Sequence, residues 1–177
     1  MRNKQKKILE LFEKSGPQLY RLLGKLTLNQ DEVGDLLQEL FLRLWKSKSF
    51  EKANDSFSYA YRAAINLAFE WRRNRRLSFQ SIENDCEAQI DSSALGKMIA
   101  GEELQKVLDA TMQLSELSRD VVVMHYIEQE SYEEISKRLG KKPQYLRALN
   151  AKAIASLREL LASNENSEVD TNSVTKR

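Results

Sequence analysis

The chain has 177 residues, 41% of them hydrophobic, and a net charge of +2, so it can build one ordinary domain or two small ones around real cores. Glycine (6) and proline (2) are scarce, no stretch shows a strand-like alternation, and we expect an all-α fold. A single cysteine, Cys86, and a single histidine, His125, exclude an internal disulfide and disfavour a zinc site or a Ser-His-Asp triad. We therefore expect no metal, no cofactor and no enzymatic activity.

The first residues are basic but do not form a secretory signal. The apolar run that follows them is broken by Glu10 and Glu13, and no cleavage site comes after it. No other stretch is apolar over the length of a membrane span. We expect a cytoplasmic protein without membrane insertion.

Charge is distributed unevenly along the chain. Residues 1–76 hold 16 basic and 9 acidic side chains, residues 77–101 hold 1 and 4, and residues 102–163 hold 9 and 10. A basic first half indicates binding to a polyanion.

Two helices are expected at the start of the chain. The first covers residues 4–15 and ends at Gly16, and the second begins at Pro17 and continues to about Leu26. Asn29 and Glu32 are a plausible cap pair for a third helix, which should run to about Lys46.

The third helix has one misplaced leucine. At 100° per residue its apolar side chains, from Val33 to Trp45, share one broad arc. Leu42 instead lies among Asp35, Gln38, Glu39 and Lys46. It is either an isolated exposed residue or the apolar centre of a docking surface with a charged rim. This helix alone favours the isolated residue.

Residues 47–57 read as a loop, and a fourth helix is expected from Ser56 to about Arg76. Its end carries four arginines in five residues, which can neutralise several phosphates, and nearby rings offer flat surfaces for unpaired bases: Tyr59, Tyr61, Phe69 and Trp71. The alternative is a solvated helix end whose cations favour the helix dipole. The helix by itself does not separate these two interpretations.

Residues 77–101 lack an apolar stripe and predict a linker between two domains. Cys86 lies in this linker and is expected to be an unreactive free thiol. Helical periodicity returns from Leu104. From residue 164 the chain has no core pattern and is expected to be disordered to its end at residue 177.

The second half contains a helix-turn-helix pattern. Ser131 and Glu134 form a capping box, Gly140 ends the helix, and Pro143 opens the next one. In such motifs the second helix lies in the DNA major groove. Its outward face carries Gln144, Arg147, Ala148, Ala151, Lys152, Ala155 and Arg158, whereas many helix pairs of this shape only pack on each other.

Three segments in this order resemble the extracytoplasmic-function (ECF) group of bacterial RNA polymerase sigma factors. They are residues 35–45 (DLLQELFLRLW), residues 64–68 (AINLA) before the arginine-rich end, and residues 131–135 (SYEEI) with Leu139 and Gly140. Their order and spacing match the family across about residues 4–161. The resemblance implies two helical domains. The first, at 1–76, binds polymerase and the promoter minus-ten element; the second, at 102–163, binds the minus-thirty-five element.

The resemblance also implies roles for particular residues. The third helix docks on the clamp helices of the largest subunit of core RNA polymerase, through Asp35, Gln38, Glu39 and Leu42. The following loop holds an unstacked base and the fourth helix contacts the non-template strand, through Lys52, Asn54, Phe57, Tyr59, Arg62, Asn66, Glu70, Arg72, Arg73, Arg75 and Arg76. The minus-thirty-five residues are Lys142, Gln144, Tyr145, Arg147, Ala148, Ala151 and Lys152. The implied partners are core polymerase, promoter DNA and an anti-sigma factor.

The second half departs from the family pattern in several places, one of them at residues 145–149 (YLRAL), where the family tends to have Thr-Val-x-Ser-Arg. Leu114-Ser115-Glu116 stands where the family usually has Leu-Pro-Pro, and Lys142-Pro143 stands where a serine cap is common. Asn150 faces the apolar stripe, and such an asparagine must find partners or cost about 1–3 kcal/mol. Two alternatives therefore stay open. One is a helix-turn-helix regulator that acts on a palindromic site without polymerase. The other is a sigma-like adaptor that binds polymerase or another protein with little DNA specificity.

Overall fold

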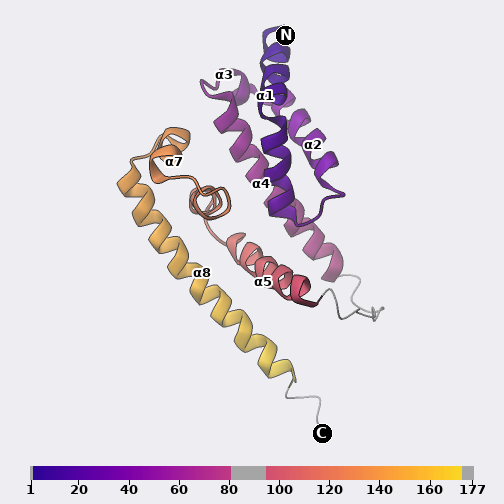
Figure 1. Cartoon of the computed structure of the whole chain (residues 1–177), viewed down its shortest axis with the longest axis vertical. Helices are drawn as coiled ribbons and strands as arrows, with labels where there is room; N and C mark the ends of the chain where they lie inside the picture. Colours follow the sequence, from indigo (N-terminus) through magenta and orange to yellow (C-terminus); the bar gives the residue numbers. More distant parts are fainter. Residues whose placement is uncertain (1, 81–94, 173–177) are drawn as a thin grey trace.

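The computed structural model describes residues 2–80 and 95–172, with side chains for residues 4–77 and 101–163, and the elements in these ranges are helices (Figure 1). The all-α expectation is confirmed. The elements are α1 (Arg2–Thr27), α2 (Val33–Lys46), α3 (Lys48–Lys52), α4 (Ser56–Gln80), α5 (Leu95–Thr111), α6 (Glu116–Val122), the π-helical η1 (Val123–Ile127), α7 (Tyr132–Leu139) and α8 (Pro143–Asn172).

The first helix is continuous, so the break expected at Gly16 and Pro17 is wrong. A proline inside a helix costs about 3 kcal/mol, because it removes a hydrogen bond and crowds the preceding turn. Buried side chains lie on both sides of Pro17, from Ile8 to Leu26, and α1 packs on α2 and α4. Each buried aliphatic side chain contributes about 1.5–3 kcal/mol, so several of them outweigh the cost of one proline.

Two local predictions in the first half differ from the structure. The expected Asn29–Glu32 cap pair does not form: Glu32 precedes α2 without a side-chain cap, and the Asn29 side chain accepts a hydrogen bond from the amide of Asp31 at 3.2 Å. The expected loop at 47–57 contains the short helix α3, because the Ser47 hydroxyl accepts a hydrogen bond from the amide of Phe50 at 3.1 Å and caps it.

Helices extend into the expected linker and into the expected tail. α4 continues to Gln80 and α5 begins at Leu95, so both ends of the expected linker at 77–101 are helical. The predicted free thiol of Cys86 lies outside the described residues. α8 continues to Asn172, although a disordered tail was expected from residue 164. No glycine or proline follows Pro143 before Asn172, so no residue type in that stretch stops the helix.

The helix-turn-helix is confirmed in local detail. The Ser131 hydroxyl accepts a hydrogen bond from the amide of Glu134 at 3.3 Å, and the Glu134 carboxylate accepts one from the amide of Ser131 at 2.8 Å. Gly140 ends α7 with a left-handed φ of 63°, which glycine adopts without steric cost. Pro143 is the first residue of α8.

The buried Asn150 finds partners for its side-chain nitrogen, whereas its oxygen Oδ1 has no hydrogen-bond partner among the described residues. Its side-chain amide donates to the hydroxyls of Tyr126 at 3.1 Å and Tyr132 at 2.8 Å. Tyr126 belongs to η1, a π-helical turn that the sequence does not predict. The three residues therefore connect η1, α7 and α8 through side-chain hydrogen bonds.

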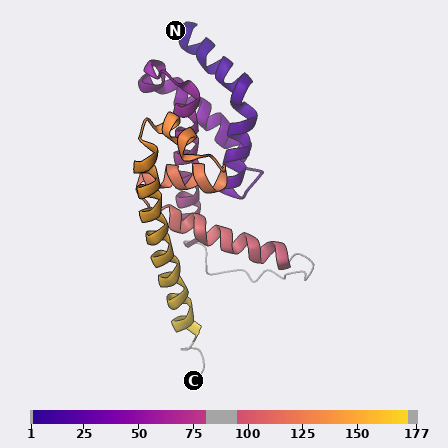
Figure 2. The same cartoon turned by 60° about the vertical axis from the view of Figure 1, so that its left-hand side comes forward.

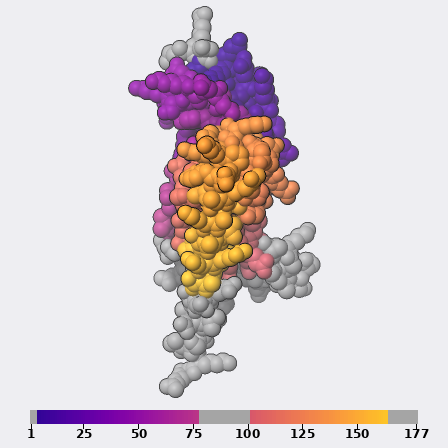
Figure 3. Space-filling view, turned by 90° about the vertical axis from the view of Figure 1, so that its left-hand side faces the viewer, coloured from indigo at the N-terminus to yellow at the C-terminus, as the bar shows by residue number. Residues whose placement is uncertain are grey.

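The two halves of the chain pack against each other. α4 contacts α6, and Lys25 of α1 forms an ion pair of 3.0 Å with Glu128. Buried side chains of both halves belong to one apolar cluster, and a second cluster lies between the α5–α6 region and α8. Figure 2 shows α5 crossing below the α1–α4 helices, and Figure 3 shows α7 and α8 covering one face of the second half. Within the described ranges, no helix is long and apolar enough to span a membrane.

Candidate protein and nucleic-acid interfaces

The outward face of α2 combines an apolar groove with exposed polar side chains. Leu42 is 46% exposed, as the helical wheel predicts, and Asp35 and Gln38 are also exposed. Leu42 is not isolated, because it lines a groove of about 520 Å³ with Phe12, Gly34, Leu37, Gln38 and Phe41. Sequence periodicity assigned Leu37 and Phe41 to the core side, whereas both are half-buried and help to form this groove. The arrangement has the apolar centre and polar rim of a protein docking surface.

An arginine connects α2 to α4. The Arg43 guanidinium donates to Glu39 at 2.9 Å and to Glu70 at 2.7 Å. Its hydrogen bond holds the pKa of Glu70 below the usual value, although partial burial opposes this shift. Glu39 is a predicted polymerase contact and Glu70 a predicted promoter contact, so Arg43 joins the two surfaces directly.

The loop before α4 presents two of the predicted promoter residues to solvent. Lys52 and Asn54 are exposed, and Tyr59 on the first turn of α4 is half-buried. Lys7 of α1 also contacts this loop. Sequence reasoning missed Lys7, because a lysine more than 40 residues away from the loop gives no local signal of that contact.

The second half of the chain covers part of the predicted promoter face of α4. Arg62 donates to the Asp120 carboxylate of α6 at 2.8 Å, with Glu116 3.6 Å away. The Asn66 amide donates to Glu116 at 2.8 Å, and its oxygen accepts from Arg119 at 2.7 Å. Two predicted DNA contacts are therefore occupied by α6 side chains.

The aromatic part of the same face is covered as well. The Arg138 guanidinium of α7 lies 4.7 Å from the ring centroid of Phe57 and 4.9 Å from that of Tyr61. Cation–π contacts of this kind contribute about 0.5–2 kcal/mol. Phe57, which the sequence assigns to base binding, is thus half-buried below α7.

Arg72, which the resemblance assigns to minus-ten DNA, is buried in this structure. Only 3% exposed, it donates to Asp109 of α5 at 2.6 Å and to the Leu26 carbonyl of α1 at 3.2 Å. Burial lowers the pKa of Arg72, and the hydrogen bond that Arg72 donates to Asp109 opposes this shift. In this arrangement Arg72 joins α1, α4 and α5, whereas Arg73, Arg75 and Arg76 are exposed.

Asp120 makes the contact between the halves sensitive to pH. Its fully buried carboxylate has a pKa raised to about 6 by burial, and the Arg62 ion pair opposes this only in part. A folded-state pKa above the ordinary value means that the folded chain holds the extra proton between about pH 4 and 6. The stability from this group is present at low pH and is lost as pH rises through that window.

We therefore expect the protein to lose stability relative to the variant Asp120→Asn as pH rises from 4 to 6. The loss should be about 2 kcal/mol over this range and approach about 3 kcal/mol above it, because each pKa unit corresponds to about 1.4 kcal/mol. Urea unfolding of both chains at matched pH values measures the difference. A difference that stays constant, or that grows in favour of the protein with rising pH, would contradict this role of Asp120.

The predicted minus-thirty-five residues lie together near the start of α8. All of them are exposed: Lys142, Gln144, Tyr145, Arg147, Ala148, Ala151 and Lys152. Arg147 donates to Glu133 of α7 at 2.8 Å and lies 5.4 Å from the ring centroid of Tyr132. The helix therefore offers one continuous exposed face, in which Arg147 is already oriented by α7.

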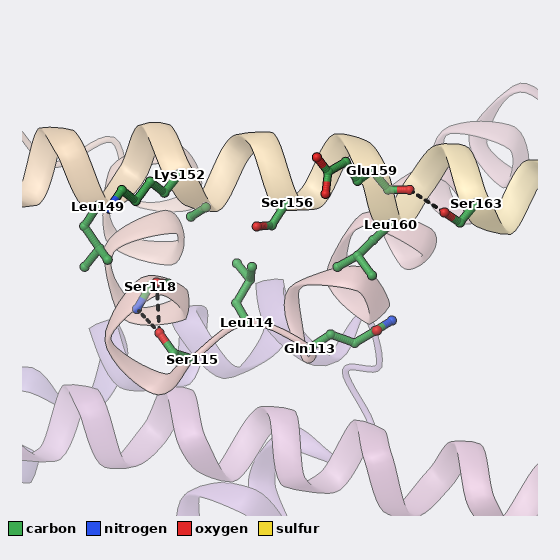
Figure 4. A pocket seen from close by; sticks show the side chains of 11 residues that line it. Gln113, Leu114, Ser115, Ser118, Leu149, Lys152, Ser156, Glu159, Leu160 and Ser163 are labelled. Atoms are coloured by element: carbon green, nitrogen blue, oxygen red, sulfur yellow. Dashed lines mark hydrogen bonds between the residues drawn. The ribbon is translucent and has the colours of Figure 1, made fainter.

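A groove of about 620 Å³ lies between α8 and the turn before α6, and Figure 4 shows the side chains that line it. Leu114 points into it below α8. Ser115 is the N-cap of α6. The Ser115 hydroxyl accepts a hydrogen bond from the amide of Ser118 and donates one to the Ser118 hydroxyl at 2.9 Å. Serine at this position thus starts the helix by side-chain capping, which explains how α6 begins without the prolines of the family pattern.

Comparison with known proteins identifies the class to which these two surfaces belong. The model of Sigma-70 region 2 matches residues 11–77, and that of Sigma-70, region 4 matches residues 104–156. The RNA polymerase sigma-E factor of Streptomyces avermitilis is 30% identical over 150 residues, which cover 83% of this chain and 80% of the relative. The corresponding factor of Streptomyces antibioticus is 31% identical over 137 residues, covering 76% and 73%. The chain belongs to the ECF group of RNA polymerase sigma factors.

Two further relatives complete the comparison. The ECF RNA polymerase sigma factor SigE of Mycolicibacterium smegmatis is 30% identical over 86% of this chain, which spans 61% of the length of that relative. Among solved structures, the sigma factor RpoE of Bartonella quintana, in complex with the anti-sigma factor NepR, matches 92% of this chain and 98% of its own. That match has 20% identity and a TM-score of 0.48.

Proposed function

We propose that the chain binds core RNA polymerase as a sigma subunit and directs it to a set of promoters. The observation that carries this proposal is the α2 surface, where Leu42 lies exposed in an apolar groove beside Asp35 and Gln38. Family membership supports the same partner. In this role the chain acts in the cytoplasm and performs no catalysis of its own, since polymerase forms the RNA.

Promoter contacts divide between the two halves in this proposal. Lys52, Asn54 and the exposed arginines after Arg72 meet the opened minus-ten segment, and the exposed face of α8 meets minus-thirty-five duplex DNA. Extruding a base costs a few kcal/mol. Stacking of the base on aromatic rings, together with cationic side chains that pair with the DNA phosphates, offsets that cost only where the duplex is opening. Recognition and melting of the minus-ten element therefore occur together.

The packing of α6 and α7 against α4, which we call the closed arrangement, places a condition on this function. Arg62 and Asn66 cannot contact DNA while they pair with Asp120, Glu116 and Arg119. The α6 side chains must therefore leave α4 before the complete promoter face is available. Membership in the family also supports an anti-sigma factor as a partner that controls the free chain.

A direct binding experiment tests the proposal. The tagged full-length chain is incubated with purified core polymerase, and we expect the polymerase subunits to be retained and the complex to elute as one species in gel filtration. A helix-turn-helix regulator that acts alone would instead bind duplex DNA without retaining polymerase. Absence of any stable complex with core enzyme contradicts the proposal.

A further inference from the structure

Two lysines of α1 anchor the loop that precedes α4. Lys4 and Lys7 lie one turn apart on the helix, with their ammonium groups directed at backbone carbonyls. Lys4 donates to the carbonyl of Ser47 at 2.8 Å, at the end of α2. Lys7 donates to three carbonyls at the end of α3, those of Phe50 at 3.1 Å, Glu51 at 3.2 Å and Ala53 at 2.7 Å.

The contacts of Lys7 use the whole donor capacity of its side chain. An ammonium group has three protons, and here three carbonyls accept them. The last carbonyls of a helix have no partner within the helix and carry partial negative charge, so a cation stabilises them. The neighbouring Lys6 is different, because its highly exposed ammonium lies 3.8 Å from Glu10 on the same helix. Lys7 therefore holds the protein backbone, whereas Lys6 remains on the surface.

Lys7 also contacts, through Phe50, the ring of Tyr59, which the sequence predicts to stack on a base. Its ammonium lies 5.2 Å from the ring centroid of Phe50, which is fully buried. Phe50 packs edge-on against Tyr59, with 5.7 Å between the ring centroids, and the Tyr59 hydroxyl forms a hydrogen bond of 2.9 Å with Ser47. The position of Lys7 therefore fixes both the loop backbone and the ring at the start of α4.

We propose that Lys7 is a positioning residue for base recognition at the minus-ten element, acting through the backbone of residues 50–53 and through Tyr59. This inference rests on the proposed function of the chain as a sigma factor. A base pocket discriminates only if its walls stay in place when the strand enters, and the loop has little helix of its own to hold it. Lys7 supplies that rigidity from another helix and contacts no base itself.

Holoenzymes carrying matched variants test this role. Purified core polymerase is assembled with the full chain as wild type, Lys7→Met, Lys7→Arg or Lys6→Met. Each complex selects from DNA duplexes whose minus-ten segment is randomised and held open by mismatches, and sequencing of bound DNA gives the base preference at each position. Hydrogen exchange of the amides of residues 48–57 reports loop rigidity, and circular dichroism reports folding.

With Lys7→Met, we expect the preference at one minus-ten position to fall at least about fivefold, since a site rejects the wrong base strongly only while its walls stay in place. Other positions should change less than about twofold, and exchange in the loop should rise. Lys7→Arg should keep most of the preference, because a guanidinium also donates to several carbonyls. Lys6→Met should match wild type.

Preference that is unchanged at every position, or lost equally at all positions, in a folded Lys7→Met chain would overturn the role of Lys7. If that chain does not fold, Lys7→Gln takes its place with the same expectation. If the wild-type holoenzyme itself shows no preference at any position, that result contradicts both the role of Lys7 and the proposed function of the chain.

Discussion

Replacing Leu42 with aspartate is expected to weaken binding of core RNA polymerase by at least about 30-fold. Leu42 is the apolar centre of the α2 surface, and truncation of a central contact residue typically costs 2 kcal/mol or more. An aspartate there would also bring an unpaired charge into the groove formed with Phe12 and Phe41. Titration of labelled core polymerase with the purified chain measures the effect.

Leu9→Asp is the matched control for this variant. Leu9 is 57% exposed on α1 and does not line the α2 groove, so the same substitution should leave polymerase affinity within about twofold. Reversal of charge at Asp35, for which no ion pair is found among the described side chains, should also weaken binding without loss of helix content in circular dichroism. Equal affinities for Leu42→Asp and Leu9→Asp would contradict the docking role of α2.

The double variant Asp109→Ala, Glu116→Ala is expected to open the chain and to increase its affinity for single-stranded DNA at least about fivefold. Asp109 pairs with the buried Arg72, and Glu116 pairs with Arg62 and Asn66. Loss of a buried partner costs the closed arrangement about 3–5 kcal/mol. The apparent affinity of a chain that binds only when open rises with the open fraction.

The measurement compares free chains by fluorescence anisotropy with a labelled pool of random single-stranded oligonucleotides at one salt concentration, and by small-angle X-ray scattering. We expect a larger radius of gyration together with the gain in affinity. Glu102→Ala, Glu103→Ala is the control, because it changes the net charge equally at exposed positions of α5. An equal gain in the control would show that charge alone explains the effect, and an unchanged radius would contradict opening.

The sequence predicted most of what depends on local pattern. The helical wheel placed Leu42 outside the core, and the spacing of Ser131, Glu134 and Gly140 predicted a cap and a stop that the structure contains. These features involve residues within one or two helical turns, where periodicity and capping rules apply directly. The motif order was also sufficient to indicate the family.

Three larger features that the sequence did not predict depend on contacts between distant residues. Pro17 in the sequence predicts the start of a helix, whereas α1 stays continuous there because it packs on α2 and α4. Arg72 looked like one more arginine in a basic cluster, yet α5 and the end of α1 surround it. The sequence around Lys7 does not indicate its contacts, since its partners are backbone carbonyls more than 40 residues away.

The closed arrangement gives α4 two sets of partners for the same side chains. In the free chain Arg62 pairs with the buried Asp120, and in the proposed complex it pairs with the opened promoter strand. The acidic side chains of α6 pair with basic and polar side chains of α4, which explains how a half of the chain that is not net basic fits against the basic first half. If this face binds the promoter as we propose, promoter binding and the contact between α4 and α6 exclude each other.

Transcription in vitro tests the sigma function most directly. Purified core polymerase is combined with the chain and with a library of genomic DNA fragments, and the 5′ ends of the transcripts are sequenced. We expect discrete start sites that share a minus-ten and a minus-thirty-five element, and we expect them to disappear with Leu42→Asp. Transcripts without preferred start sites, or start sites that are the same without the chain, would contradict the function proposed for this protein.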